Sequence, residues 1–235
     1  MDTYEYTECY IAFLDMLGFK NFVNDNSCNG IIEIFHTFNH KPISEAYLGI
    51  ESIVSKSTVD ELKIKVMSDS ICLYIDAKVP DALMCLFMSC SLLQFELLDH
   101  STPIFLRGAI VLGEIYTDND ITFGPGLTSA YLMEENNAKY PRIILTKEVL
   151  SNIDCSDSKK NIVNTLVFKD FDAFYAINYF NLIASVGGEL YENIALSVNN
   201  VLDTTTDNSI REKYLYFDKN LSEKVEPFIR NKKNN

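Results

Sequence analysis

Two strand-like segments only four residues apart constrain the fold more than any other feature of the chain. Residues 62–66 (LKIKV) alternate apolar and basic side chains, residues 71–75 (ICLYI) are apolar, and Met67-Ser68-Asp69-Ser70 separates them. Strands joined by so short a connection pair as an antiparallel hairpin. This hairpin fixes part of a sheet and places Asp69 at its tip.

The rest of the first 146 residues predicts the elements that complete this sheet. Apolar runs typical of buried strands occur at residues 9–14, 104–112 and 141–145. Helical patterns occur at residues 19–23, 31–38, 80–98 and 125–135. The order β-α-β-β-α-β predicts an α+β fold, a ferredoxin-like split βαβ arrangement in which one antiparallel sheet carries helices on one face.

The pattern changes after Thr146, which predicts a core over residues 1–146 and a C-terminal α-rich extension over 147–235. A small hairpin is expected near residues 167–177, followed by a helix over 191–202. Apolar residues from Ile210 to Val225 then recur at spacings of four and three, as in an amphipathic helix that Pro227 should end or kink. We expect the extension to pack on the core or on a second copy of the chain, and the polar tail 231–235 to be frayed.

The charge balance disfavours one class of partner. Twenty Lys and Arg stand against 33 Asp and Glu, a net charge of −13, which disfavours binding to a nucleic-acid backbone. A phosphorylated small molecule is compatible with this charge, because metal ions bridge acids to phosphates. The longest apolar stretch, 82–98, is too polar to span a bilayer. Six cysteines without a CxxC pair, and no secretory signal, predict a reduced, cytoplasmic protein without a membrane anchor.

Two acidic residues are candidate metal ligands. Asp15 ends a predicted strand and Asp69 is at the hairpin tip, two positions that a split βαβ sheet brings to one rim. Two carboxylates there can hold a pair of divalent ions about 3.5–4 Å apart, and the Met16 peptide carbonyl can add a ligand. Taken singly, Asp15 as a helix N-cap and Asp69 as a turn residue are the better interpretations. Together, the two favour metal.

Neighbouring residues suit a phosphorylated substrate. Gly18 and Phe19 can offer free N–H groups at a helix start to a phosphate. Lys65 could reach a base edge or a phosphate, or be an exposed edge lysine. Arg107 interrupts an apolar strand and needs a carboxylate, such as Glu134, or a phosphate as partner.

Four segments resemble the motifs of class III nucleotidyl cyclases, in order, over about residues 8–146. Residues 13–19 (FLDMLGF) resemble F-x-D-x-x-G-F, and 63–70 (KIKVMSDS) resemble the K-x-x-G-D hairpin with Ser68 in place of glycine. Residues 106–113 (LRGAIVLG) are similar to R-x-G-[IV]-x-x-G. Residues 123–134 (FGPGLTSAYLME) are similar to W-G-x-x-V-N-x-A-x-R-M-E.

The resemblance implies an enzyme whose Asp15 and Asp69 bind two Mg²⁺ or Mn²⁺ ions with the Met16 carbonyl assisting. It maps Lys65 onto the lysine that reads the base in purine cyclases. It also implies a head-to-tail homodimer with active sites at the interface. The reaction would be displacement of pyrophosphate from an NTP by its own 3′-hydroxyl.

At two positions the sequence departs from the motifs of purine cyclases. The asparagine and arginine that steady the transition state in purine cyclases align with Thr128, a nucleotide-binding candidate, and Leu132. Either Arg107, Lys139 or Arg142 supplies the charge, or catalysis is weak or absent. The pattern looks most like the bacterial Pycsar-type pyrimidine cyclases, which make cyclic UMP or cyclic CMP from UTP or CTP for a separate effector in antiphage defence. The alternatives are a palm-type cyclic dinucleotide synthase and a degenerate, non-catalytic nucleotide sensor.

Overall fold

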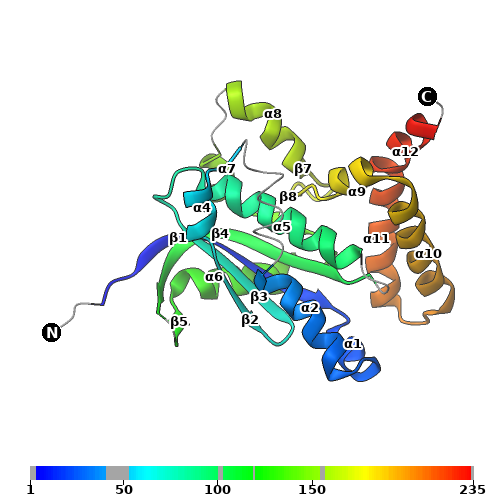
Figure 1. Ribbon diagram of the computed structural model, residues 1–235, viewed down its shortest axis with the longest axis horizontal. Coiled ribbons are helices and arrows are strands. Elements are labelled where there is room, and N and C mark those ends of the chain that lie inside the picture. The colour runs from blue at the N-terminus through cyan, green and yellow to red at the C-terminus, as the bar shows by residue number, and fades with distance from the viewer. Residues whose placement is uncertain (1–3, 41–52, 100–102, 119, 154–156, 234–235) are drawn as a thin grey trace.

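The computed structural model describes residues 4–40, 53–99, 103–118, 120–153 and 157–233. Helices pack on a twisted, mostly antiparallel sheet (Figure 1), so the α+β fold class is confirmed. The strands are β1 (Thr7–Leu17), β2 (Lys63–Met67), β3 (Ser70–Asp76), β4 (Phe105–Thr117), β5 (Thr122–Phe123), β6 (Ile143–Leu145), β7 (Val167–Lys169) and β8 (Tyr175–Ile177). Their order is β2-β3-β1-β4-β6-β8-β7, with β5 paired to β4. Within this order, the part β2-β3-β1-β4 has the split βαβ arrangement that the sequence predicts.

The helices follow the expected positions in the first half and add several in the second. They are α1 (Phe19–Asp25), α2 (Cys28–His40), α4 (Lys56–Glu61), α5 (Ala82–Leu98), α6 (Pro125–Asn137), α7 (Lys147–Ser151), α8 (Asp157–Leu166), α9 (Phe180–Val186), α10 (Gly188–Thr204), α11 (Asn208–Lys224) and α12 (Glu226–Lys233). Sequence periodicity did not predict α4 or α7–α9, which are short or weakly patterned. It also predicted a frayed tail where α12 continues to Lys233.

Side chains of β1 alternate between two apolar layers. Ala12, Leu14 and Met16 belong to the layer under α5. Ile11 and Phe13 belong to the layer under α6. Because successive strand residues point to opposite faces, Asp15 lies on the α6 face of the sheet with Phe13.

The sheet therefore carries helices on both faces, whereas the sequence predicted one. The difference is α6, which approaches β4 so closely that their backbones touch. A Cβ atom added to Gly113 would lie 2.6 Å from the Gly126 Cα atom, so only a glycine pair permits this contact. Figure 1 shows α5 and α6 on opposite sides of the sheet. Sequence periodicity gave no sign of this long-range contact.

The C-terminal region continues the sheet and adds its own apolar cluster. β8 pairs with β6, and β7 pairs with β8. Helices α9–α12 surround Tyr179, Phe180 and Phe217, and this cluster also contains Leu98 and Phe105 from the first half of the chain. The rings of Phe105 and Phe217 are 4.5 Å apart. α11 ends at Lys224 and α12 begins at Glu226, the break predicted from Pro227.

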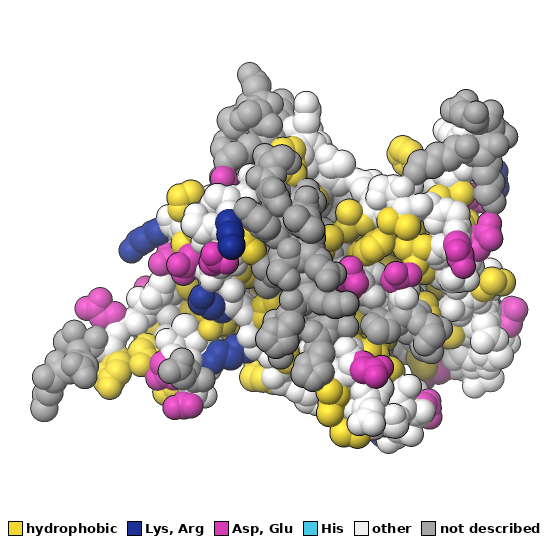
Figure 2. All heavy atoms as spheres, in the orientation of Figure 1, with side chains coloured by type: hydrophobic (Ala, Val, Ile, Leu, Met, Phe, Trp, Pro, Cys, Tyr) yellow, Lys and Arg dark blue, Asp and Glu magenta, His cyan; other side chains and the backbone are white. Residues whose placement is uncertain are grey.

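Surface and cysteine features complete the description. Within the described ranges, no helix is both long and apolar enough to cross a membrane. Cys9, Cys72, Cys85 and Cys90 are buried free thiols, whereas Cys28 is an exposed one. On the face drawn in Figure 2, Asp and Glu side chains are scattered widely, and most of the Lys and Arg side chains gather toward α4 and β2.

Candidate active site

The fold brings Asp15 and Asp69 to neighbouring positions at one rim of the sheet. Asp15 pairs with Ser70 in the β1–β3 register. The backbone N–H of Met16 donates a 2.9 Å hydrogen bond to the carbonyl oxygen of Asp69. Two residues that are 54 positions apart in the sequence thus lie one strand spacing from each other. This is the juxtaposition that the sequence predicts.

The turn that carries Asp69 is strained. Ser68 and Asp69 form a two-residue connection between the paired residues Met67 and Ser70. Ser68 has a φ of +60°, a conformation that favours glycine. A non-glycine residue held there costs about 1–3 kcal/mol. The serine thus adopts the backbone conformation for which the resembling motif uses glycine.

Arg107 joins Asp15 to a buried acid on α6. Its Nε atom lies 2.8 Å from Asp15 Oδ2 and 2.9 Å from Glu134 Oε1. Arg107 faces Asp15 across the β1–β4 register, and Glu134 is only 3% exposed. The carboxylate partners of Arg107 thus include the predicted Glu134.

Carboxylates outnumber cations at this rim. Burial raises the pKa of Glu134 to about 6, Arg107 opposes the shift, and the negative charges of Asp15, Glu135 and Asp69 add to it. The side chain of Asp69 is partly exposed and forms no ion pair or side-chain hydrogen bond within the described part of the chain. One guanidinium therefore pairs with two acids, Asp15 and Glu134, and Asp69 has no cation of its own among the described residues, which leaves room for additional positive charge.

The donors present suit a hard divalent cation that is held partly by substrate. Two carboxylates and a backbone carbonyl supply oxygen ligands of the kind that Mg²⁺ and Mn²⁺ prefer. No group of three or more His, Cys, Asp or Glu side chains in the described ranges could hold a metal by itself. Mg²⁺ is commonly bound through one or two carboxylates together with waters and substrate phosphates. The site fits that mode.

Gly18 and Phe19 follow directly on this rim. Gly18 has a φ of +80° and is the N-cap of α1, and a Cβ atom there would meet nothing within 4 Å. The Phe19 ring packs near Phe22 and Phe35. The first N–H groups of a helix have no partner within it.

Lys65 lies on the α6 face with Asp15 but two strands away. Its Cα pairs with Cys72, which puts it about 12 Å from the Asp15 Cα by strand geometry. Its Nζ atom donates a 3.1 Å hydrogen bond to the carbonyl oxygen of Asp118. The Asp118 carboxylate accepts the N–H groups of Asp120 and Ile121, which closes the β4–β5 turn.

A row of hydroxyl groups beside Lys65 was missed from the sequence. Tyr74 and Thr117 share a 2.9 Å hydrogen bond, and Thr117 and Thr122 share one of 2.8 Å. Tyr74 is two residues from Cys72 on β3, so strand alternation could have placed it on the same face. The contact with Thr117 depends on how β4 lies relative to β3 in the folded sheet, and no local pattern predicts that placement.

The residues at the two departures from the cyclase motifs are exposed on α6. The Thr128 hydroxyl donates a 3.4 Å hydrogen bond back to the carbonyl oxygen of Gly124. Leu132 is 47% exposed.

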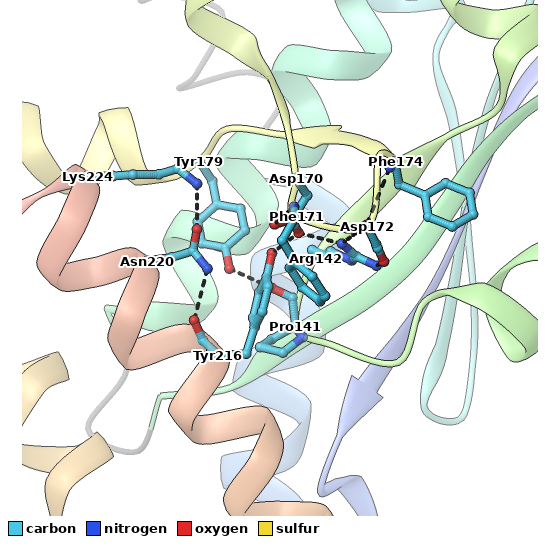
Figure 3. Close-up of polar contacts among 10 residues, drawn as sticks. All are labelled: Pro141, Arg142, Asp170, Phe171, Asp172, Phe174, Tyr179, Tyr216, Asn220 and Lys224. Carbon is cyan, nitrogen blue, oxygen red and sulfur yellow. Dashed lines mark hydrogen bonds and ion pairs between the residues drawn. The ribbon is translucent and has the colours of Figure 1, made fainter.

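Two of the three cations suggested as replacements, Lys139 and Arg142, pair with acids away from Asp15. Arg142 is 1% exposed and held by Asp170 and Asp172 (Figure 3). Lys139 pairs with Glu212 at 2.7 Å. Of Arg107, Lys139 and Arg142, Arg107 is therefore the one that contacts Asp15.

Comparisons with known proteins find only distant likenesses. No family model matches the chain, and no curated protein matches it. Among solved structures, it is similar to the guanylyl cyclase domain of the RhoGC fusion protein from Blastocladiella emersonii, with 17% identity, a TM-score of 0.48, and coverage of 73% of this chain and 95% of that one. It is also similar to an adenylate/guanylate cyclase/hydrolase from Silicibacter pomeroyi, with 17% identity, a TM-score of 0.45, and coverage of 74% and 96%. These likenesses are too distant to assign an activity.

Proposed function

We propose that this protein is a nucleotide cyclase that converts a pyrimidine NTP, UTP or CTP, to its 3′,5′-cyclic monophosphate and pyrophosphate. The observation that carries the proposal is the rim where Asp15 and Asp69 are neighbours and carboxylates exceed cations. Lys65 lies on the same face, with its Cα atom about 12 Å from the Asp15 Cα atom by strand geometry. That distance is similar to the length of a nucleotide. The four motif resemblances along residues 13–134 support the same assignment.

Each residue at the rim has a role in this scheme. Asp15, Asp69 and the Met16 carbonyl would hold two Mg²⁺ or Mn²⁺ ions, which when bound neutralise the triphosphate and acidify the ribose 3′-hydroxyl. Gly18 and Phe19 would donate backbone N–H groups to phosphate oxygens. Arg107 would counter the charge that develops on the α-phosphate. The 3′-hydroxyl would release its proton to water, and the 3′-oxygen would form its bond to the α-phosphorus as the bond to pyrophosphate breaks, in line.

Base recognition would fall to Lys65 and the groups beside it. An ammonium group only donates, so Lys65 would bind a base carbonyl. Hydroxyl groups both donate and accept, so the row of Tyr74, Thr117 and Thr122 could complement the edge of uracil or of cytosine. Thr128, on the first turn of α6, would contact the nucleotide.

The surroundings of the site suit a homodimer. Large apolar side chains are exposed on or beside the α6 face at Met67, Ile121, Phe123, Tyr131 and Leu132. A second copy, docked head to tail, would cover them and complete an active site at the interface. By the resemblance, the protein would act in the cytoplasm in bacterial antiphage defence, and a separate cyclic-nucleotide-binding effector would detect the product.

Incubation of the full chain with each of the four NTPs and Mn²⁺, followed by chromatography and mass spectrometry, tests the proposal. We expect cyclic UMP or cyclic CMP. Asp15→Asn and Asp69→Asn should each lower turnover at least about 10³-fold with an unchanged circular dichroism spectrum, because most of the rate comes from positioning and electrostatics. The exposed Asp60→Asn is the matched control. A cyclic dinucleotide would instead identify a palm-type synthase, and full activity of Asp69→Asn would refute the site.

One observation favours a second candidate, a nucleotide sensor without turnover. Arg107 is engaged by Asp15 and Glu134, and Thr128 and Leu132 replace the transition-state residues of purine cyclases. A sensor would gain thermal stability from an NTP with Mn²⁺ but release no pyrophosphate. Pyrophosphate release in the same sample rules it out.

A further inference from the structure

Glu134 is a buried carboxylate that lacks a hydrogen bond at one of its oxygens. Only 3% of the residue is exposed, and its Oε1 atom accepts no hydrogen bond within the described ranges. Apart from Arg142, it is the only buried residue with a charged side chain among those described. An unpartnered polar atom in a protein interior is unfavourable, so its presence needs an explanation.

The nearest cation already donates its hydrogen to another acid. Arg107 Nε lies 2.9 Å from Glu134 Oε1 and 2.8 Å from Asp15 Oδ2. That nitrogen carries a single hydrogen, and in the structure it donates to Asp15. Two carboxylates therefore compete for one N–H group. The Asp15 side chain is 19% exposed and that of Glu134 is 4% exposed, so Asp15 is the acid that water or a cation can reach.

The position of Glu134 is fixed by α6. Gly126, Ala130 and Glu134 recur every four residues and form the buried face of this helix. The backbone of Gly126 lies against that of Gly113 on β4, which prevents the helix from withdrawing the carboxylate from the sheet. Glu134 therefore stays beside Arg107 when other groups at the rim change.

We propose that Glu134 is the second acceptor for Arg107. When Asp15 turns its oxygens to cations, the Arg107 Nε–H would donate to Glu134 Oε1 instead, and the guanidinium would stay at the rim rather than turn into solvent. Glu134 is thus a positioning residue that acts through Arg107. The exchange of acceptors follows from the contacts of these three side chains, whereas its service to a reaction rests on the proposed function.

The negative charge of Glu134 matters most when cations are present. Like charges repel, so a divalent ion on Asp15 would drive the Arg107 guanidinium away from the rim. Glu134 opposes that displacement because its charge attracts the guanidinium from the other side. In the proposed reaction, Arg107 counters charge that develops in the transition state. Loss of Glu134 should therefore lower kcat rather than raise KM.

Exchange of the Arg107 Nε hydrogen with water tests the change of acceptor without metal or substrate. In ¹H–¹⁵N spectra of the full chain, its signal is identified by its loss in Arg107→Lys, and Asp15→Ala removes the first acceptor. We expect the hydrogen to stay protected in Asp15→Ala and to exchange at least tenfold faster when Glu134→Met is added. Glu134→Gln keeps an acceptor oxygen and should be intermediate. Glu148→Met, which removes an exposed acid on α7, is the matched control in the same background.

Two outcomes of this experiment would overturn the proposal. One is fast exchange in Asp15→Ala alone, which would mean that water takes the place of Asp15. The other is equal exchange with and without Glu134. Circular dichroism checks that each variant folds. Glu134→Gln, which has the shape of the native residue, replaces Glu134→Met if the latter does not fold, and exchange must then rise at least threefold.

Turnover tests the service to the reaction. With Mn²⁺ and the NTP that the full chain cyclises, Glu134→Met should lower kcat at least tenfold and change KM less than twofold. In an Arg107→Met background the same substitution should lower kcat no further, because residues that act as a unit are not additive. A loss that is equal in both backgrounds, or confined to KM, would overturn the positioning role. A chain that cyclises no NTP refutes the proposed function, while the exchange experiment still decides whether Glu134 is the second acceptor.

Discussion

Two arginines, Arg107 on β4 and Arg142 directly before the neighbouring strand β6, contact their carboxylates in opposite ways. Arg142 is buried, bound by Asp170 and Asp172, and surrounded by four aromatic rings at 5.4–5.9 Å. Arg107 is partly exposed and shares one Nε atom between Asp15 and Glu134, with Asp69 nearby. The first guanidinium is held by two carboxylates through its Nη1 and Nη2 groups and serves the fold, although its buried Nε atom has no hydrogen-bond partner among the described residues. The second is outnumbered by acids, which is the condition for binding further cations.

The largest expected effect is the loss of Arg142. Arg142→Met leaves Asp170, Asp172 and the Tyr216 hydroxyl without their buried counter-charge. Removing one partner of a buried ion pair costs about 3–5 kcal/mol, and urea unfolding measures it. Lys139→Met breaks the exposed pair with Glu212 and should lower the free energy of unfolding far less, because exposed ion pairs contribute little to stability. Equal losses in the two variants would show that Arg142 is not the structural arginine.

Loss of Arg107 should be milder. Arg107→Met leaves Asp15 partly hydrated, and Glu134 can relieve its burial by taking up a proton. We expect a cost of about 1–3 kcal/mol at pH 7, smaller than that of Arg142→Met in the same urea experiment. Addition of Glu134→Gln should recover part of the loss. A cost equal to that of Arg142→Met would erase the distinction between the two arginines.

The pH dependence of stability should expose the surplus of acid at the rim. The folded pKa of Glu134 is raised to about 6, so the folded state retains a proton that the unfolded chain releases near pH 4.5. This contribution is present below pH 4.5 and is lost as pH rises through 6, on the order of 1 kcal/mol. Urea unfolding of Glu134→Gln from pH 4.5 to 6.5 should lack this loss. Glu148→Gln, which removes an exposed acid on α7, should keep the wild-type slope, and an identical slope in all three proteins would contradict the assignment.

The smallest effect concerns one strained turn in each region. Ser68 precedes Asp69 at a φ of +60°, and Ala173 follows Asp172 at a φ of +68°. Glycine relieves this conformation but adds entropy to the unfolded chain, so Ser68→Gly and Ala173→Gly should each raise stability by roughly 0.5–1 kcal/mol. Differential scanning calorimetry measures the shift in Tm. A lower Tm for Ser68→Gly alone would mean that the serine side chain supports the turn.

Local patterns predicted the hairpin 62–75, the buried helix before residue 98, and the meeting of Asp15 with Asp69. They succeeded because strand alternation and a four-residue connection leave few arrangements open. They could not pair Arg142 with Asp170 and Asp172, which lie 28 and 30 residues away on a hairpin with short strands. They also missed the Tyr74–Thr117 contact, and they predicted helices on one face of the sheet, whereas α6 packs on the other face from α5. Those features depend on tertiary register, which no single segment encodes.

The contact between Gly113 and Gly126 has a consequence for how this surface can diversify. Because the backbones of α6 and β4 are in contact at these two glycines, α6 cannot shift or tilt relative to the sheet without a clash or a gap. New properties on its outward side must then come by exchanging residues such as Thr128 and Leu132, while the helix itself stays where it is. The α6 backbone therefore stays constant while its outward side chains vary.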